Sequence, residues 1–145
     1  MITEIEARDD LRRLFPLIDT GMAEISRRNG ETRWIGADIY ALALDGTIRM
    51  AVIHGEDPPT VYGWLSWHID DDGLTRKELS VFMMYLTPDA PRQAMAEVTT
   101  FLDNAAVEGG ANMIRFDTVR QGWVRRLAPF GYTQQAIVLT RRIET

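Results

Sequence analysis

The sequence predicts one α/β domain whose second half, Glu78 to Ile143, runs strand–helix–strand–helix–strand. Three observations support this fold class. The chain has 145 residues, which fits one domain, residues 1–145, with a single hydrophobic core. Its content of 46% hydrophobic and 26% charged residues is that of an ordinary globular protein. Its apolar residues switch between helical spacing and alternation along the chain, so helices and strands follow one another.

The composition also excludes several functions. The chain has no cysteine, which excludes disulfides, cysteine-ligated zinc and a thiol nucleophile. Its 16 basic and 21 acidic residues give a net charge of −5, which opposes binding to a nucleic-acid backbone. The acidic start Met1–Glu6 differs from a signal peptide, and the longest apolar run, Val81–Leu86, is far shorter than the ~20 residues of a membrane span. We therefore expect a soluble, cytoplasmic protein that binds neither nucleic acid nor membrane.

The first predicted elements are a short strand and a long helix. Ile2–Glu6 is the candidate strand. Apolar residues from Leu11 to Ile25 recur at helical spacing, and either Asp9 or Asp10 can cap the helix that they form. Pro16 lies inside this pattern and should kink or split the helix, because proline cannot donate a backbone hydrogen bond.

The segment Thr32–Leu44 allows two interpretations. Trp34, Ile39 and Leu42 would form the apolar face of a second helix. Alternatively, Ala37–Leu44 followed by Asp45-Gly46 and Thr47–Ile53 resembles a β-hairpin with a tight turn. We favour the helix because alanine and leucine are strong helix formers.

Three strands are predicted next. Residues alternate between apolar and polar from Thr47 to Ile53, and Val61–Ile69 is rich in aromatic and β-branched residues. Asp70–Gly73 lacks the ligand spacing of a calcium loop and is predicted to be a turn. Leu79–Leu86 is apolar on both faces, so we expect it at the centre of the sheet with both faces covered.

The clearest helix of the chain opens at Pro88–Pro91, with Asp89 as its candidate cap. Its apolar stripe runs from Ala94 to Ala106, and Gly109-Gly110 ends it.

Three short elements complete the prediction. Met113–Asp117 forms a strand, and Gln121–Ala128 forms a helix with Trp123 and Leu127 on one side. Thr133–Arg142 closes the chain as an alternating strand.

This order of elements and several short motifs resemble the GNAT fold of the N-acetyltransferases. Val61–Leu65 looks like the third strand of that fold. Gly122–Leu127, followed by Phe130-Gly131-Tyr132, looks like its fourth helix and the Gly-aromatic pair after it. The resemblance covers nearly the whole chain and implies a mixed, mostly antiparallel central sheet flanked by helices on both faces.

Within this fold, the chain resembles short GNAT-like proteins encoded by tailed bacteriophages. Those proteins carry a Trp…Asp-Ile-Tyr…Leu…Asp-Gly stretch, matched here by Trp34, Asp38-Ile39-Tyr40, Leu44 and Asp45-Gly46. This match also supports the helical interpretation of Thr32–Leu44.

The GNAT resemblance implies acetyl-CoA as the cofactor and an amine as the acceptor. The family holds the pyrophosphate on backbone N–H groups of a glycine-rich loop at the start of its third helix. The corresponding segment here, Asp89–Ala96, contains no glycine, and its Pro91 lacks an N–H, so we expect weakened binding. The candidate cofactor-binding residues are Leu86, Thr87, Arg92, Gln93, Ala94 and Met95.

The resemblance assigns no catalytic residue. Many members use a tyrosine of the fourth helix as general acid, and Leu127 occupies that position here. Glu78 and His68 could each approach an amine as a base. A solvated strand-end carboxylate and a half-exposed structural histidine are the alternatives. His54 and His68 lack the spacing of a helical zinc pair, so no metal is expected.

Two functions therefore remain. One is acetyl-CoA-dependent N-acetyl transfer to an amine. The other is a catalytically silent GNAT-fold component of a bacteriophage particle or infected cell, with protein partners or as a homo-oligomer. The missing glycines and tyrosine favour weak or absent activity.

Overall fold

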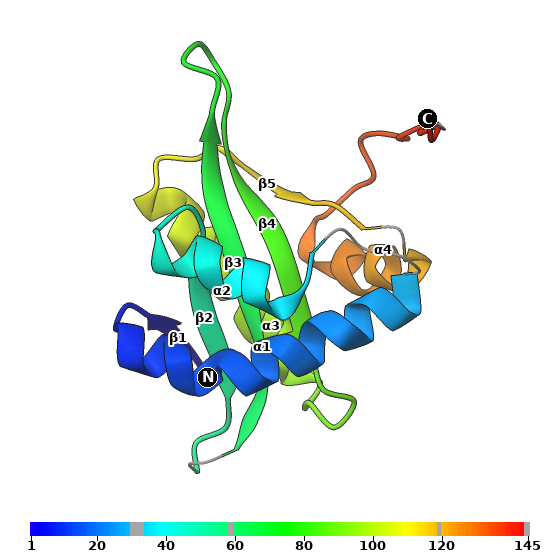
Figure 1. The fold of residues 1–145 in the computed structure, drawn as a ribbon. Coiled ribbons are helices and arrows are strands. Elements are labelled where there is room, and N and C mark those ends of the chain that lie inside the picture. Colours follow the sequence, from blue (N-terminus) through cyan, green and yellow to red (C-terminus); the bar gives the residue numbers. More distant parts are fainter. Residues whose placement is uncertain (30–33, 58–59, 119, 144–145) are drawn as a thin grey trace.

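A five-stranded sheet forms the centre of the protein (Figure 1). The computed structural model describes residues 1–29, 34–57, 60–118 and 120–143. Neighbouring strands pair in the order β1 (Ile2–Ile5), β2 (Arg49–His54), β3 (Val61–Asp71), β4 (Lys77–Leu86) and β5 (Met113–Phe116). The first three pairings are antiparallel and β5 runs parallel to β4. The predicted mixed, mostly antiparallel sheet is thus confirmed.

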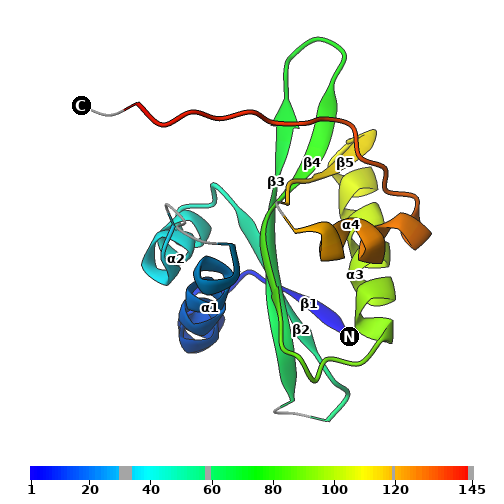
Figure 2. The same cartoon turned by 90° about the vertical axis from the view of Figure 1, so that its right-hand side faces the viewer.

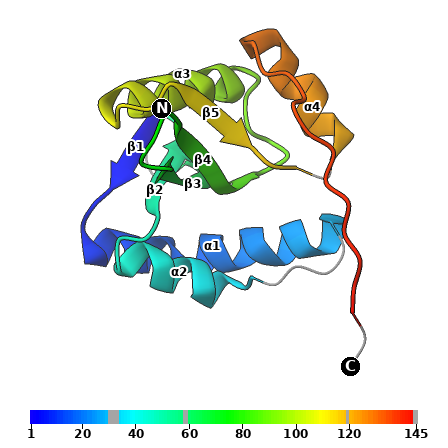
Figure 3. The same ribbon diagram turned by 90° about the horizontal axis from the view of Figure 1, so that it is seen from above.

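Helices cover both faces of this sheet (Figures 2 and 3). The long helix α1 (Arg8–Asn29) and α2 (Gly36–Leu44) lie on one face. On the other lie α3 (Gln93–Glu108) and α4 (Gln121–Leu127), which continues into a 3₁₀ turn at Ala128–Phe130. Apolar residues of β4 pack into the buried clusters of both faces, as the apolar pattern of Leu79–Leu86 predicted.

Helix α1 rests directly on β3 and β4. A Cβ atom on its Gly21 would lie 2.7 Å from the indole nitrogen of Trp64 and 2.8 Å from Cγ of Tyr85. The same indole donates a hydrogen bond of 3.0 Å to the carbonyl oxygen of Leu17. Pro16 does not split α1, which is continuous over 22 residues. Glycine at position 21 therefore sets the distance between α1 and the sheet.

The helical interpretation of the second apolar segment is confirmed by α2, and the hairpin alternative is wrong. Thr32 at the start of that predicted segment lies outside the described residues. The isoleucine at the N-cap, Ile35, has no side-chain acceptor to offer. Instead, the Asp38 carboxylate accepts a hydrogen bond of 2.9 Å from the Ile35 backbone N–H.

Both aspartate caps predicted from the sequence are wrong. Helix α1 already begins at Arg8, so Asp9 and Asp10 lie in its first turn, where their charge still suits the helix dipole. Asp89 belongs to a turn in which the Ala90 N–H donates to the Thr87 carbonyl oxygen at 3.1 Å. This turn delays α3 until Gln93 and leaves its N-terminus without a side-chain cap.

The predicted closing strand at Thr133–Arg142 is also wrong. Residues 133–143 form neither helix nor strand, and all of them are exposed. After Gly131, whose φ of 88° requires glycine, the chain leaves the α3/α4 face and runs past the level of α1 and α2 (Figures 2 and 3). The residues favour a strand, but a strand also needs hydrogen bonds to a neighbouring strand, and the described sheet ends at β5 without this segment.

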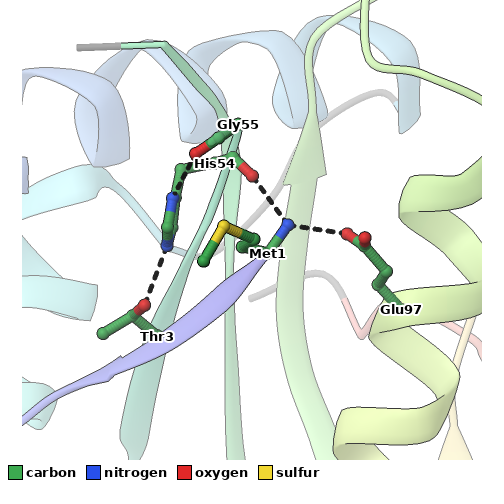
Figure 4. A network of polar contacts seen from close by, with 5 residues as sticks. All are labelled: Met1, Thr3, His54, Gly55 and Glu97. Carbon is green, nitrogen blue, oxygen red and sulfur yellow. Dashed lines mark hydrogen bonds and ion pairs between the residues drawn. The ribbon is translucent and has the colours of Figure 1, made fainter. Parts of the chain in front are cut away.

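The amino-terminal end ties β1 to β2 and α3 (Figure 4). The Met1 ammonium donates to the carbonyl oxygen of His54 and to the Glu97 carboxylate, each at 2.7 Å. The His54 ring contacts Thr3 Oγ1 at 2.8 Å and the carbonyl oxygen of Gly55 at 2.7 Å. His54 thus has a structural role, and no group of metal-ligating side chains occurs among the described residues.

Candidate functional site

The strand β4 contains a bulge that separates it from β5. On β3, Ser66 pairs with Met83 and Trp67 pairs with Val81, so Phe82 is an extra residue in β4. Phe82 and Met83 both pack against the α1/α2 side, which is the arrangement that a bulge produces. Pairing between β4 and β5 ends at Val81 and Phe116, immediately before this bulge. Bulges often redirect strands beside active sites.

Beyond the bulge, β4 keeps one unpaired edge. Its pairing with β3 continues to Leu86, whereas no described strand pairs with residues 82–86 on the other side. Figure 1 shows β4 and β5 diverging from their shared end. We call residues 82–86 on this side the β4 free edge. Backbone N–H and C=O groups there can bond an extended ligand in the manner of an added strand.

A single hydroxyl group holds the bulge in place. Ser66 is completely buried, and its Oγ donates to the Met83 carbonyl oxygen at 3.0 Å. The same Oγ accepts a hydrogen bond of 3.0 Å from the Met83 N–H. Ser66 therefore replaces the ladder partners that the extra residue displaces. The sequence analysis missed this residue, because a serine within a strand carries no signal of the register of the next strand.

The free edge leads to the uncapped start of α3. Leu86 is buried, and the N–H of Thr87 donates to the carbonyl oxygen of Tyr62 at 2.8 Å. The Thr87 hydroxyl is buried and has no hydrogen-bond partner. This unsatisfied group lies at the point where the free edge meets the turn into α3.

The remaining candidate cofactor residues divide into an exposed and a buried pair. Arg92 and Gln93 are exposed at the first turn of α3, where the helix dipole favours an anion. Ala94 and Met95 are buried against the sheet and serve the core. The structure thus leaves Arg92 and Gln93 as the polar groups that an anionic ligand can reach.

A second group of polar residues lies on the α1/α2 face of the sheet, toward the start of β4. Ser80 pairs with His68 on one side and with Arg115 on the other, and Glu78 pairs with Asp70. Directly paired residues share a face, and so do residues two apart on a strand. We call His68, Asp70, Glu78, Ser80 and Arg115 the polar cluster. The rings of His68 and Phe82 lie edge to face, with their centroids 6.2 Å apart, so the polar cluster adjoins the bulge.

Glu78 is the unusual member of the polar cluster, since it is only 4% exposed. The expectation of a solvated strand-end charge is therefore wrong, because β5 lies beside Glu78 and covers it. Its Oε2 lies 3.4 Å from Arg76 Nε and its Oε1 lies 3.7 Å from Arg115 Nη1. These are ion-pair distances, yet Oε2 is buried without a hydrogen bond. A buried carboxylate with an unused lone pair can accept a proton.

The neighbours of Glu78 are held by other partners. Arg115 donates a hydrogen bond of 2.9 Å to Asp117, which is the main cause of its raised pKa, with Glu78 contributing less. His68 is half-exposed, as expected, and its Nε2 lies 3.1 Å from Asp70. Its Nδ1 is buried without a hydrogen bond. Glu78 and His68 thus both present unsatisfied polar atoms on this face.

Helix α4 and the residues after it contribute packing contacts but no side chain suited to act as a general acid. Leu127 is buried. The Trp123 ring packs against Phe116 with their centroids 5.6 Å apart, and the Arg126 guanidinium carbon lies 5.1 Å from the centroid of the Trp123 ring. The hydroxyl of Tyr132 is buried without a partner. Burial, assisted by the negative charge of Asp103, raises the pKa of Tyr132 to about 12. A tyrosine that holds its proton this tightly is a poor general acid at neutral pH.

A hollow in the surface lies away from the β4 free edge and the polar cluster. It has a volume of about 300 Å³ and lies between β1, the start of α1 and the turn after α2. Glu4 and Arg49, which line it, form a hydrogen-bonded ion pair at 2.6 Å. No residue of the β4 free edge or of the polar cluster lines it. Among the described residues, no helix is long and apolar enough to cross a membrane.

Neither a family model nor a curated protein matches the chain. Solved structures do match along its whole length. A protein described as a probable acetyltransferase superimposes with a TM-score of 0.76 at 13% identity, covering 100% of this chain and 99% of that one. The ribosomal-protein-alanine N-acetyltransferase of Brucella melitensis biovar Abortus 2308 gives 0.71 at 13% identity, with 99% of each chain covered. The glucosamine-6-phosphate N-acetyltransferase of Arabidopsis thaliana gives 0.69 at 13% identity, covering 99% and 98%.

Proposed function

Since the chain has the GNAT fold of these acetyltransferases, we propose that it binds acetyl-CoA along the β4 free edge and transfers the acetyl group to an amine. The observation that carries this proposal is the bulge at Phe82, which ends the pairing of β4 with β5 and exposes backbone hydrogen-bonding groups. An extended amide-containing arm can bond those groups as an added strand would.

The residues that follow the β4 free edge would bind the remainder of acetyl-CoA. Residues Leu86 and Thr87 would contact the arm as it leaves β4. The backbone of Arg92, Gln93, Ala94 and Met95, at the uncapped start of α3, would face the pyrophosphate. The Arg92 guanidinium is exposed and can pair with a phosphate, which compensates in part for the missing glycines.

Glu78 is the base in this proposal, because its buried Oε2 has no hydrogen-bond partner. The amine nitrogen would form a bond to the thioester carbonyl carbon, its proton would pass to Glu78, and the carbon–sulfur bond would break. Glu78 precedes Phe82 by four residues, or about 13 Å along the strand, so water would relay the proton. A thiolate with a pKa of about 8.5 leaves readily and can take its proton from solvent, so neither Leu127 nor Tyr132 needs to act.

Binding is tested by thermal unfolding with and without acetyl-CoA. A ligand at 100 times its dissociation constant stabilises a protein by about 2.7 kcal/mol. Arg92→Glu should reduce this stabilisation, whereas Arg12→Glu, an exposed arginine of α1 on the opposite face, should leave it unchanged. Unfolding that does not respond to millimolar acetyl-CoA would contradict the proposal.

Turnover is tested by the release of free thiol from acetyl-CoA in the presence of a panel of primary amines. The protein has no cysteine, so every thiol detected belongs to the product. Loss of a general base lowers a rate by about 10²–10⁴-fold, which is the effect expected of Glu78→Gln. The matched control is Glu108→Gln, an exposed carboxylate at the end of α3.

A second candidate is a protein of this fold that binds without catalysis, as an assembly component of a bacteriophage particle or infected cell. It is favoured by the glycine-free turn before α3 and by Leu127 at the acid position. Stabilisation by acetyl-CoA without thiol release from any amine would support this candidate over the enzyme.

A further inference from the structure

Two polar atoms of the polar cluster are buried without a hydrogen-bond partner. They are Nδ1 of His68 and Oε2 of Glu78. Nearly all buried polar atoms in proteins are hydrogen-bonded, and the exceptions often have a catalytic role or hold a water molecule. The proposed base accounts for the free oxygen of Glu78, but it leaves the free nitrogen of His68 unexplained.

The contact with Asp70 determines which ring nitrogen of His68 carries the proton. Nε2 of His68 lies 3.1 Å from Oδ1 of Asp70. An ionised carboxylate only accepts hydrogen bonds, so Nε2 of the neutral ring is the N–H donor, and Nδ1 keeps a lone pair. The two unsatisfied atoms, Nδ1 of His68 and Oε2 of ionised Glu78, are therefore both acceptors. A group that satisfies both of them must donate two hydrogens.

The register of the sheet places His68 between the bulge and Glu78. His68 on β3 is directly opposite Ser80 on β4, and Ser80 stands midway between Glu78 and Phe82 in the sequence. Directly opposite residues have Cβ atoms about 4.5–5.5 Å apart, and diagonal neighbours such as His68 and Glu78 are about 7–8 Å apart, within reach of long side chains. A proton relayed from the bulge to Glu78 therefore passes His68 and Ser80.

We propose that Nδ1 of His68, Oε2 of Glu78 and the hydroxyl of Ser80 hold the last water of the proton relay, an inference that rests on the proposed acetyl transfer. A water molecule has two hydrogens for the two acceptors, and its oxygen can accept a hydrogen bond from the Ser80 hydroxyl. The second lone pair of the water then faces the bulge, from which the proton comes.

The step balances without a charge on the histidine. As the amine nitrogen bonds to the thioester carbonyl carbon, its proton passes along the relay to this water. The water gives the hydrogen that already points at Glu78 to Oε2 and becomes neutral again, while the carbon–sulfur bond breaks and the sulfur leaves as a thiolate. His68 accepts a hydrogen bond throughout and gains no proton. It is therefore a positioning residue, which orients the water toward the carboxylate.

The ring tautomer of His68 tests this inference without any need for turnover. The chain has only two histidines, His54 and His68, so the imidazole ¹⁵N spectrum contains two sets of signals, which His68→Asn assigns. Spectra recorded near pH 8 report on the neutral ring. We expect the form protonated at Nε2. A ring protonated at Nδ1 would donate where the water needs an acceptor, and this result would overturn the inference.

Three substitutions of His68 test its role in turnover. His68→Asn keeps an acceptor near the position of Nδ1, His68→Gln keeps a polar group near Nε2 instead, and His68→Leu removes both. At saturating acetyl-CoA and amine, kcat for thiol release should fall by roughly 10–100-fold in the Gln and Leu variants and by less than about threefold in the Asn variant. The KM for the amine should not change, because the relay acts only in the transition state.

The outcomes separate this inference from the proposed function. Thermal stabilisation by acetyl-CoA should be the same in the natural chain and in every variant, which shows that each one is folded. If His68→Leu does not fold, the comparison of His68→Asn with His68→Gln decides. Equal values of kcat in the Asn and Gln variants would overturn the positioning role while leaving the acetyl transfer intact. A natural chain that releases no thiol with any amine would refute the acetyl transfer itself, and the relay with it.

Discussion

Replacing Ser66 with alanine tests the role of its hydroxyl in holding the β4 bulge. This hydroxyl is completely buried and makes two hydrogen bonds of 3.0 Å, one to each backbone polar group of Met83. Alanine fits the same space, so the substitution removes the two bonds and little else.

The loss of stability in Ser66→Ala has two parts, one for each hydrogen bond that is removed. Losing the bond to the Met83 carbonyl oxygen costs about 0.5–1.5 kcal/mol, and leaving the partly buried Met83 N–H without an acceptor costs about 1–3 kcal/mol. We therefore expect Ser66→Ala to lower the free energy of unfolding by about 2–4 kcal/mol, which lowers Tm by roughly 5–15 °C for a domain of this size. Because the bulge is less constrained, the affinity for acetyl-CoA should fall as well.

The assay is urea unfolding followed by tryptophan fluorescence, with acetyl-CoA binding measured on the folded variant. Ser80→Ala, on β4 itself, is the matched control and should change the stability by less than about 0.5 kcal/mol. If Ser66→Ala is as mild as Ser80→Ala, the hydroxyl does not hold the bulge, and the reasoning is refuted.

Two further predictions concern packing and pH. A Cβ on Gly63 would lie 1.9 Å from the carbonyl oxygen of Tyr85, so Gly63→Ala should destabilise the domain by more than ~3 kcal/mol in urea unfolding. Gly122→Ala, with no atom within 4 Å of its Cβ, should be neutral, and equal effects would contradict this packing. The pKa of Tyr132, raised to about 12 by burial and by Asp103, means that the unfolded state ionises first as the pH rises. The contribution of Tyr132 to the free energy of unfolding is therefore fully present below pH ~10. It falls by about 1–2 kcal/mol toward pH ~12, after allowance for the partial exposure of the side chain, and Tyr132→Phe should not show this loss.

Much of the fold was predictable because each element carries its own local signal. The stripe from Ala94 to Ala106 identified α3, and the apolar residues on both faces of β4 correctly indicated that both of its faces are covered. The expected position at the centre of the sheet is wrong, because β4 is the fourth of five strands. The ends of elements were harder to predict. Asp89 has the right chemistry for a cap, but a turn formed by Thr87 and Ala90 occupies its position.

The candidate site was predictable only in part, because it depends on contacts between distant residues. Phe82 stands in an unbroken apolar run, and only its pairing with β3 reveals it as the extra residue of a bulge. Glu78 follows two basic residues and reads as a surface charge, yet β5, more than thirty residues later, buries it. Residues 133–143 have the composition of a strand, yet they form neither helix nor strand in the structure.

The most direct test of the central claim is amide hydrogen exchange with and without saturating acetyl-CoA. If the cofactor lies along the β4 free edge, exchange should slow in residues 82–86 and at the start of α3 around Arg92, while α2 on the opposite face is unchanged. Unaltered exchange in residues 82–86, with or without protection elsewhere, would contradict the account.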